Sequence, residues 1–155
     1  FRSLADFFDT EKPSTIGLFV VTAEPLRQPA GDSERLMLHA LCARLAEAGT
    51  EWLQRKYYGE GRVLRAAFGY ASCPDHSLKR TVIDWLDAEQ QLGITLTDHY
   101  SIKPSTSVCG LFIAHPDAHY FPVGHIDRKQ LEDYCHRRGI DIAEGEQLLS
   151  KYCNS

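Results

Sequence analysis

A single long helix, predicted from residue 32 to about residue 57, sets the frame into which the rest of the chain must fit. Asp32 or Ser33 stands at its start as an N-cap, and Gly59 and Gly61 follow its end. The apolar residues in between step by three and four: Leu38, Leu41, Leu45, Ala48 and Trp52. Because this spacing places them along one side of a helix, we expect that side to be buried.

Short apolar segments rich in β-branched and aromatic residues predict strands elsewhere. These segments are residues 15–22, 95–102, 107–113 and 120–126. The last two are predicted to form a hairpin around a turn at residues 115–118. Pro122 lies inside the second of them, which indicates an edge strand or a bulge.

Three further helices complete the predicted secondary structure. The first runs from about Ser77 to Leu92 and ends at Gly93, and its inward-facing residues are predicted to be Leu78, Val82, Trp85, Leu86 and Leu92. Asp127 caps the second, which stops at Gly139, and Asp141 starts the third. Strands joined by a hairpin and kept apart from helices predict an α+β fold with a twisted antiparallel sheet flanked by helices.

Length and composition narrow the protein class. A chain of 155 residues suits a single domain (1–155), whose first 14 residues are irregular. The net charge of −4, with dispersed basic residues, argues against a nucleic-acid partner, and no apolar run is long enough to cross a membrane. Five scattered cysteines favour reduced thiols and a cytoplasmic location. The chain begins at Phe1 without a secretory signal, which suggests an excerpt of a longer product.

The segment at residues 65–76, Arg-Ala-Ala-Phe-Gly-Tyr-Ala-Ser-Cys-Pro-Asp-His, carries the most chemistry. Arg65 can hold a carboxylate in bidentate fashion. Gly69 allows the backbone to approach a flat ligand, and Tyr70 can stack on a base or face a cation. The small residues around them leave main-chain donors and acceptors uncovered. These features suit a ligand with an amino-acid end and an aromatic end, such as S-adenosylmethionine.

Several long motifs, in order along nearly the whole chain, resemble one family. They are residues 15–22, 41–48, 65–76, 104–117, 120–124 and 131–139. Together they resemble the C-terminal activation domain of cobalamin-dependent methionine synthase, here in a truncated or compact version. The resemblance implies that the chain binds S-adenosylmethionine and supports the reductive methylation of cob(II)alamin. It further implies a cobalamin-binding domain or corrinoid protein as partner, which holds the cobalamin, and flavodoxin or a flavoprotein reductase as electron donor.

The resemblance also implies which residues contact the ligand. Arg65 would hold the methionyl carboxylate, and the backbone of Ala67 would bind the adenine. Tyr70 and Tyr120 would reach the nucleoside or the sulfonium, and Glu47 would lie near the positive sulfonium, where opposite charge stabilises a cation. No catalytic residue and no metal ligand are assigned, because such a domain positions a methyl group rather than supplying acid–base chemistry.

Each of these residues also has a structural interpretation. Arg65 could pair at the surface with Glu60 or another carboxylate. Tyr70 and Tyr120 could be packing residues, and Glu47 could simply be solvated. For each of these residues, the sequence excludes neither the ligand contact nor the structural role.

The chain departs from the family in three respects. The family's domain is considerably longer, and its N-terminal portion carries an acidic ligand contact with no counterpart here. The link from the long helix to Arg65 is short, so that Glu60 is only a weak candidate for a second acidic contact. Phe68, the pair Ala71–Ser72 and Cys109 replace residues that are usual in the family. Weaker binding is expected, because each lost polar contact to a charged ligand costs about 1.5–3 kcal/mol.

Two other functions remain open at this point. The chain could be a non-catalytic interaction module that keeps the fold without the ligand. A cysteine hydrolase built on Cys73 and His76 is disfavoured, because the segment lacks the other parts of a catalytic triad and better suits the start of a helix. A metal site at His115, His119 and His125 is disfavoured for want of a ligand pattern.

Overall fold

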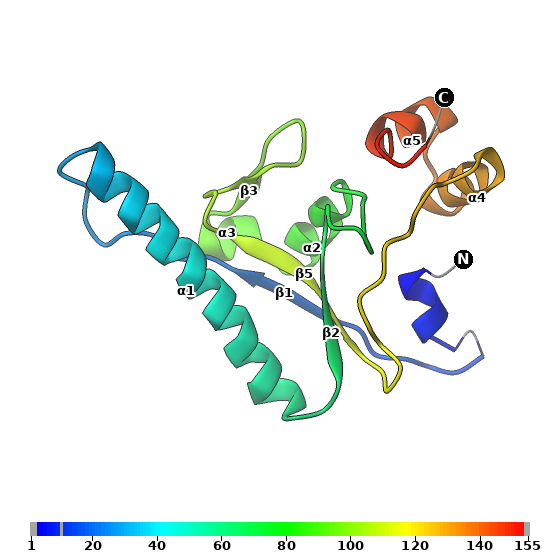
Figure 1. Ribbon diagram of the computed structural model, residues 1–155, viewed down its shortest axis with the longest axis horizontal. Helices are drawn as coiled ribbons and strands as arrows, with labels where there is room; N and C mark the ends of the chain where they lie inside the picture. The colour runs from blue at the N-terminus through cyan, green and yellow to red at the C-terminus, as the bar shows by residue number, and fades with distance from the viewer. Residues whose placement is uncertain (1–2, 10, 154–155) are drawn as a thin grey trace.

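The computed structural model describes residues 3–9 and 11–153 and has a mixed helix and sheet fold (Figure 1). The helices are the 3-10 helix η1 (Leu4–Phe7), α1 (Asp32–Tyr58), α2 (Leu78–Trp85), α3 (Ala88–Leu92), α4 (Arg128–Arg138) and α5 (Ile142–Leu148). The strands are β1 (Gly17–Val21), β2 (Val63–Ala67), β3 (Thr95–Leu96), β4 (Ile102–Lys103) and β5 (Val108–Ala114). In the part of the chain so described, no helix is both long and apolar enough to cross a membrane.

A three-stranded antiparallel sheet with the order β1-β5-β2 forms the centre of the fold. Phe19 pairs with Gly110, and Gly110 pairs with Ala67 on the other side of β5. Side chains alternate between the two faces of a sheet. Accordingly, α1 covers the face that carries Phe19 and Phe112, whose rings are 4.6 Å apart, and α2 packs against the face that carries Cys109. The predicted antiparallel α+β architecture is confirmed.

The long helix forms as predicted, but the predicted buried side is wrong. Leu41, Leu45 and Trp52 are 54%, 54% and 58% exposed, whereas the side that faces the sheet carries the small residues Cys42, Ala46 and Thr50. The reason is the close approach of α1 to the sheet: a Cβ atom on Gly49 would lie only 3.0 Å from Cγ1 of Val21. Small side chains therefore pack here, and an apolar stripe faces outward.

The start of α1 also differs from the prediction. Gly31 is the N-cap, and Asp32 is the first helical residue. No side chain caps the helix directly, but the Glu34 carboxylate accepts hydrogen bonds from the Ala30 N–H and from Arg27. The Glu34 carboxylate thus holds the segment before the helix, and its negative charge in the first turn interacts favourably with the helix dipole.

The helix predicted for residues 77–92 is two helices. Asp87 adopts a left-handed conformation (φ 50°) between α2 and α3, which turns the chain so that Ala88 and Ile94 pack with Ile83. In consequence, the predicted inward residues Trp85, Leu86 and Leu92 are exposed, while Val82 is buried and Gly93 ends α3 as predicted. The predicted strand at residues 95–102 is likewise a small hairpin, in which β3 pairs with β4.

The predicted hairpin of residues 107–113 with 120–126 is wrong. The first segment is β5, but both of its edges are taken by β1 and by β2, a strand that the sequence analysis did not predict. Residues 120–126 run as an irregular segment, joined to the body by a hydrogen bond from the Val123 N–H to the Ala71 carbonyl (2.9 Å). The turn at residues 115–118 does form, closed by the Ala118 N–H and the His115 carbonyl.

The two C-terminal helices form as predicted, with Asp127 and Asp141 as N-caps and Gly139 at the end of α4. They enclose a small core of their own, built on Leu131, Cys135 and Leu149. Polar contacts tie this pair to the body, since Tyr134 donates to the buried Asp75 carboxylate and Arg138 donates to the Ser77 hydroxyl (2.9 Å).

Candidate functional site

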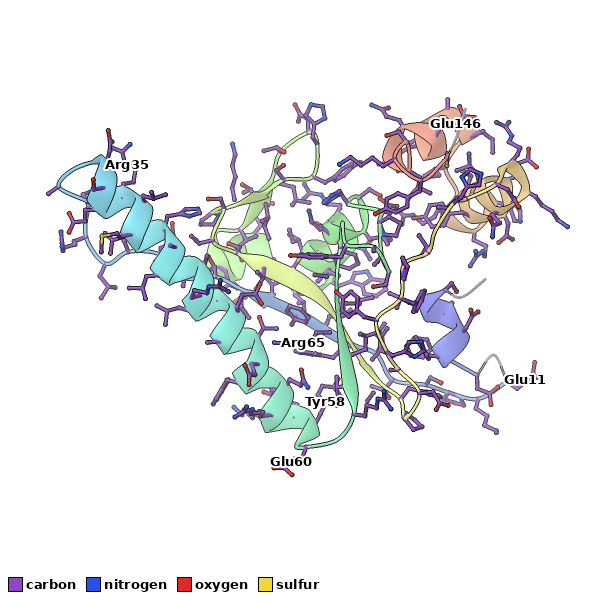
Figure 2. All side chains as sticks on the ribbon, in the orientation of Figure 1. Glu11, Arg35, Tyr58, Glu60, Arg65 and Glu146 are labelled. Atoms are coloured by element: carbon purple, nitrogen blue, oxygen red, sulfur yellow. The ribbon has the colours of Figure 1, made fainter. Side chains whose placement is uncertain are left out.

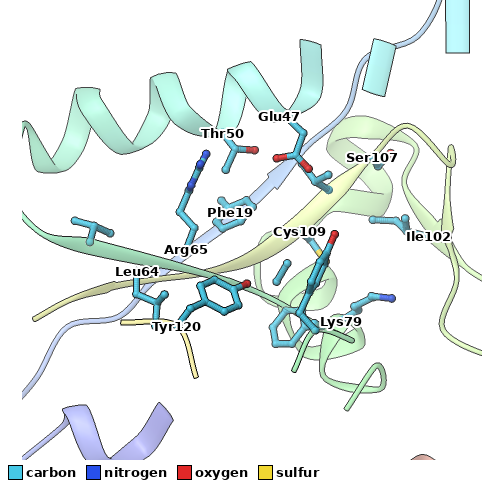
Figure 3. Close-up of a pocket in the computed structure, with 15 residues that line it drawn as sticks. Phe19, Glu47, Thr50, Leu64, Arg65, Lys79, Ile102, Ser107, Cys109 and Tyr120 are labelled. Carbon is cyan, nitrogen blue, oxygen red and sulfur yellow. The ribbon is translucent and has the colours of Figure 1, made fainter. Parts of the chain in front are cut away.

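A cavity of about 510 Å³ lies between α1 and the sheet, and all five predicted site residues line it. They are Glu47, Arg65, Ala67, Tyr70 and Tyr120. Figure 3 shows Arg65 reaching from β2 toward α1, where Glu47 and Thr50 project from the helix above it. Residues far apart in the sequence therefore meet in one place. We call this space the Arg65 cavity.

Strand and helix periodicity bring these side chains together. On β2, Leu64 and Ala66 point to the buried side, so Arg65 and Ala67 face the cavity. On α1, Glu47 and Thr50 are three residues apart and therefore lie on neighbouring positions of the helix surface. The small residues of α1 that pack on the sheet hold this helix close enough for both walls to meet.

Arg65 and Glu47 supply opposite charges that are not used within the fold. Neither side chain has an ion pair or hydrogen bond among residues 3–9 and 11–153. The pairing of Arg65 with Glu60, weighed in the sequence analysis, does not form. Glu60 lies beyond the end of α1 (Figure 2). It borders a second cavity that has only Arg65 in common with the first. A free guanidinium and a free carboxylate at one cavity suit a ligand that carries both charges.

Both tyrosines are only partly packed, which argues against a purely structural role. Tyr70 is 59% exposed and Tyr120 is 52% exposed. A tight turn carries Tyr70, closed by hydrogen bonds from the Gly69 N–H to the Cys73 carbonyl (2.8 Å) and from the Cys73 N–H to the Tyr70 carbonyl (2.9 Å). Two aromatic side chains thus stand at the cavity with room for a ligand beside them.

Comparison with known proteins identifies the family of the chain. A family model described as "Vitamin B12 dependent methionine synthase, activation domain" matches residues 1–139. The chain belongs to this family. The fold is also similar to a crystal structure of the MetH reactivation domain bound to AdoHcy, with a TM-score of 0.75 and 34% sequence identity. That match covers 80% of this chain but 44% of the other, so the chain spans less than half of that relative.

In this activation-domain chain, Cys73 has none of the properties of a nucleophile. Its thiol is buried, and burial together with the nearby Asp75 raises its pKa to about 12. A thiol is reactive only as the thiolate, which is scarce at neutral pH when the pKa is so high. Asp75 does not cap α2, whose N-cap is Ser77, but accepts a hydrogen bond from the Ser77 N–H (2.7 Å).

The histidines around residues 115–125 do not form a metal centre. His115 accepts a hydrogen bond from the Asp117 N–H, and His125 contacts the Tyr152 carbonyl at 3.1 Å. Across residues 3–9 and 11–153, no group of three or more His, Cys, Asp or Glu side chains could hold a metal ion.

Thr50 and Lys79 are among the residues of the Arg65 cavity that the sequence analysis did not name. Thr50 is buried on α1, and its hydroxyl donates to the Ala46 carbonyl (3.0 Å). Its spacing of three residues from Glu47 was the available signal. Lys79 comes from the first turn of α2, three residues after His76, and its charge offered no comparable signal because lysines are common on helix surfaces.

Proposed function

We propose that the Arg65 cavity binds S-adenosylmethionine. The observation that carries this proposal is the pair of uncommitted opposite charges, Arg65 and Glu47, on facing walls of one cavity with Tyr70 and Tyr120 beside them. The ligand has the matching parts: a carboxylate, a positive sulfonium and a flat adenine. The AdoHcy in the related MetH reactivation domain is a molecule of the same class.

Each contact follows from the chemistry of the side chain. The guanidinium of Arg65 holds the carboxylate through two parallel hydrogen bonds. Glu47 attracts the sulfonium, and the rings of Tyr70 and Tyr120 flank the cation and the base. The main chain at Ala67, on an edge of the sheet, binds the adenine. No proton transfer is required of the chain, whose contribution is to hold the methyl group in place.

We further propose that the bound ligand serves the reactivation of cobalamin in the cytoplasm. In this role the bound ligand would supply the methyl group for the reductive methylation of cob(II)alamin and would itself become S-adenosylhomocysteine. A partner domain or corrinoid protein carries the cobalamin, and flavodoxin or a flavoprotein reductase supplies the electron. The exposed side of Tyr70 and Tyr120 leaves the cavity open toward such a partner.

Titration calorimetry with S-adenosylmethionine tests the binding. Replacing Arg65 with alanine removes charge-assisted contacts of about 1.5–3 kcal/mol, so the dissociation constant should rise by about tenfold to 150-fold. Arg80→Ala is the matched control, because Arg80 is an exposed arginine on α2 that pairs with Asp84 (3.5 Å). Equal affinity of wild type and Arg65→Ala would refute the site.

The alternative function, an interaction module without the ligand, predicts no heat from either protein. The exposed apolar residues of α1, Leu41, Leu45 and Trp52, are the feature that favours a docking role. Saturable binding that depends on Arg65 would therefore exclude the ligand-free alternative.

A further inference from the structure

The imidazole of His76 lies directly over Gly69, the residue that precedes Tyr70. A Cβ atom on Gly69 would lie 1.9 Å from Cε1 and 2.4 Å from Nε2 of His76. Gly69 also has a positive φ of 91°, a conformation that favours glycine. The ring therefore covers the beginning of the tight turn that places Tyr70 at the Arg65 cavity.

Lys79 also contacts this imidazole. Its Nζ atom is 2.7 Å from Nδ1 of His76, and it donates a second hydrogen bond to the Tyr100 carbonyl (2.9 Å). An ammonium group can only donate, so Nδ1 of His76 must accept and the imidazole is neutral, with its proton on Nε2. Tyr100 lies in the loop between β3 and β4, so that Lys79 links this loop to His76 and to the cavity.

We propose that His76 and Lys79 are positioning residues that hold Tyr70 at the ligand cavity only while the His76 imidazole is neutral. The proposal rests on the proposed binding of S-adenosylmethionine. Once His76 takes up a proton, both of its ring nitrogens are donors and it repels the Lys79 ammonium. The hydrogen bond is then lost, the ring leaves Gly69, and the turn that carries Tyr70 loosens.

The charges around His76 determine the direction of the effect. Burial and the charge of Lys79 lower the pKa of His76, Asp75 opposes them by raising it, and Lys151 adds to the lowering. Burial also lowers the pKa of Lys79, with Cys109 opposing. We call the contact of His76 with Lys79 and Gly69 the His76 latch. Because the pKa of His76 is lowered when this contact is formed, the latch is formed at neutral pH and is lost as the pH falls through this pKa.

The latch can be tested without any ligand. In the free protein, NMR should show that the amide resonances of Gly69 and Cys73 shift with pH together with the His76 ring signals. His76→Gln keeps an acceptor but cannot be protonated in this range, so it should abolish the shift and keep slow amide exchange at Cys73. His76→Leu has no acceptor and should speed that exchange at every pH. Gly69 and Cys73 signals that ignore the titration of His76, or exchange unchanged in His76→Leu, would overturn the proposal.

Titration calorimetry with S-adenosylmethionine then connects the latch to binding. Between about pH 7.5 and about pH 5 the wild-type affinity should fall, since protonation of His76 removes the hydrogen bond from Lys79. His76→Gln should bind as the wild type does near neutral pH and lose most of this pH dependence, whereas Lys79→Met should bind more weakly at neutral pH. His136→Gln, an exposed histidine on α4, is the control and should keep the wild-type profile.

The two proposals fail in different ways. Absence of wild-type binding near neutral pH would refute the ligand assignment, and the NMR titration would still decide whether the latch exists. Tight wild-type binding with the same pH profile in His76→Gln would refute the latch and leave the ligand assignment in place.

Discussion

The orientation of α1 leads to a direct prediction about stability. Its small residues face the sheet and its large apolar residues face outward, the reverse of what the sequence predicts. Leu45 is 54% exposed, and its neighbour Ala46 is fully buried at 0%. Comparing the stability of two variants, Leu45→Ala and Ala46→Leu, therefore tests which side of the helix faces the sheet.

The expected magnitudes follow from burial. Burying a leucine side chain completely is worth about 1.5–3 kcal/mol, so truncating Leu45, which is less than half buried, should cost about 1 kcal/mol. If Leu45 were fully buried against the sheet, as the sequence predicts, its truncation to alanine would instead cost about 3–5 kcal/mol. Ala46→Leu adds three carbon atoms where α1 packs on the sheet, and overpacking of this kind costs about 1–3 kcal/mol or more.

Urea unfolding followed by circular dichroism gives the free energy of unfolding for each variant. Leu36→Ala, at a leucine of α1 that is 72% exposed, is the control and should change it by less than about 0.5 kcal/mol. A loss above about 2.5 kcal/mol for Leu45→Ala, or a larger loss than for Ala46→Leu, would refute the observed orientation. Measurement at two protein concentrations is part of the assay, since a concentration-dependent midpoint would show that this side is buried between copies.

Two further predictions concern the core of the fold. Gly110→Ala in β5 would place a Cβ atom 2.4 Å from the Ala66 carbonyl oxygen, so it should lower the free energy of unfolding by more than about 2 kcal/mol. Gly93→Ala is the control in the same urea assay. Gly93 has a φ of 66° but open space around it, so this change should cost only about 1 kcal/mol. Cys73, with its pKa of about 12, should resist iodoacetamide near pH 8 in the folded protein and react after unfolding. Peptide mass spectrometry that finds rapid labelling of Cys73 itself in the folded chain would contradict its burial.

The parts of the fold that depend on local signals were predictable. Asp127 and Gly139 mark the two ends of α4 through capping geometry that involves only residues close in the sequence. The cavity residues were found for a different reason: Arg65, Ala67 and Tyr70 lie within one continuous motif, and the family resemblance adds Glu47 and Tyr120.

The parts of the fold that depend on contacts between distant residues were not predictable from the sequence. Residues 107–113 have the pattern of a strand, but nothing local in that pattern says that the partners are β1 and β2 rather than residues 120–126. The choice of partner depends on long-range contacts, and Pro122, which has no N–H group, would leave one hydrogen bond unmade if its segment paired with β5. The same applies to Asp87, whose left-handed turn serves the packing of Ala88 and Ile94.

The sequence by itself determined the family and the existence of the long helix, because each depends on continuous runs of residues. Only the tertiary structure decided which side of α1 is buried, since a helical repeat marks an apolar side without measuring how near the sheet lies. The sheet lies so near at Gly49 and Ala46 that only small residues fit. That close contact brings Glu47 and Arg65 to the same cavity.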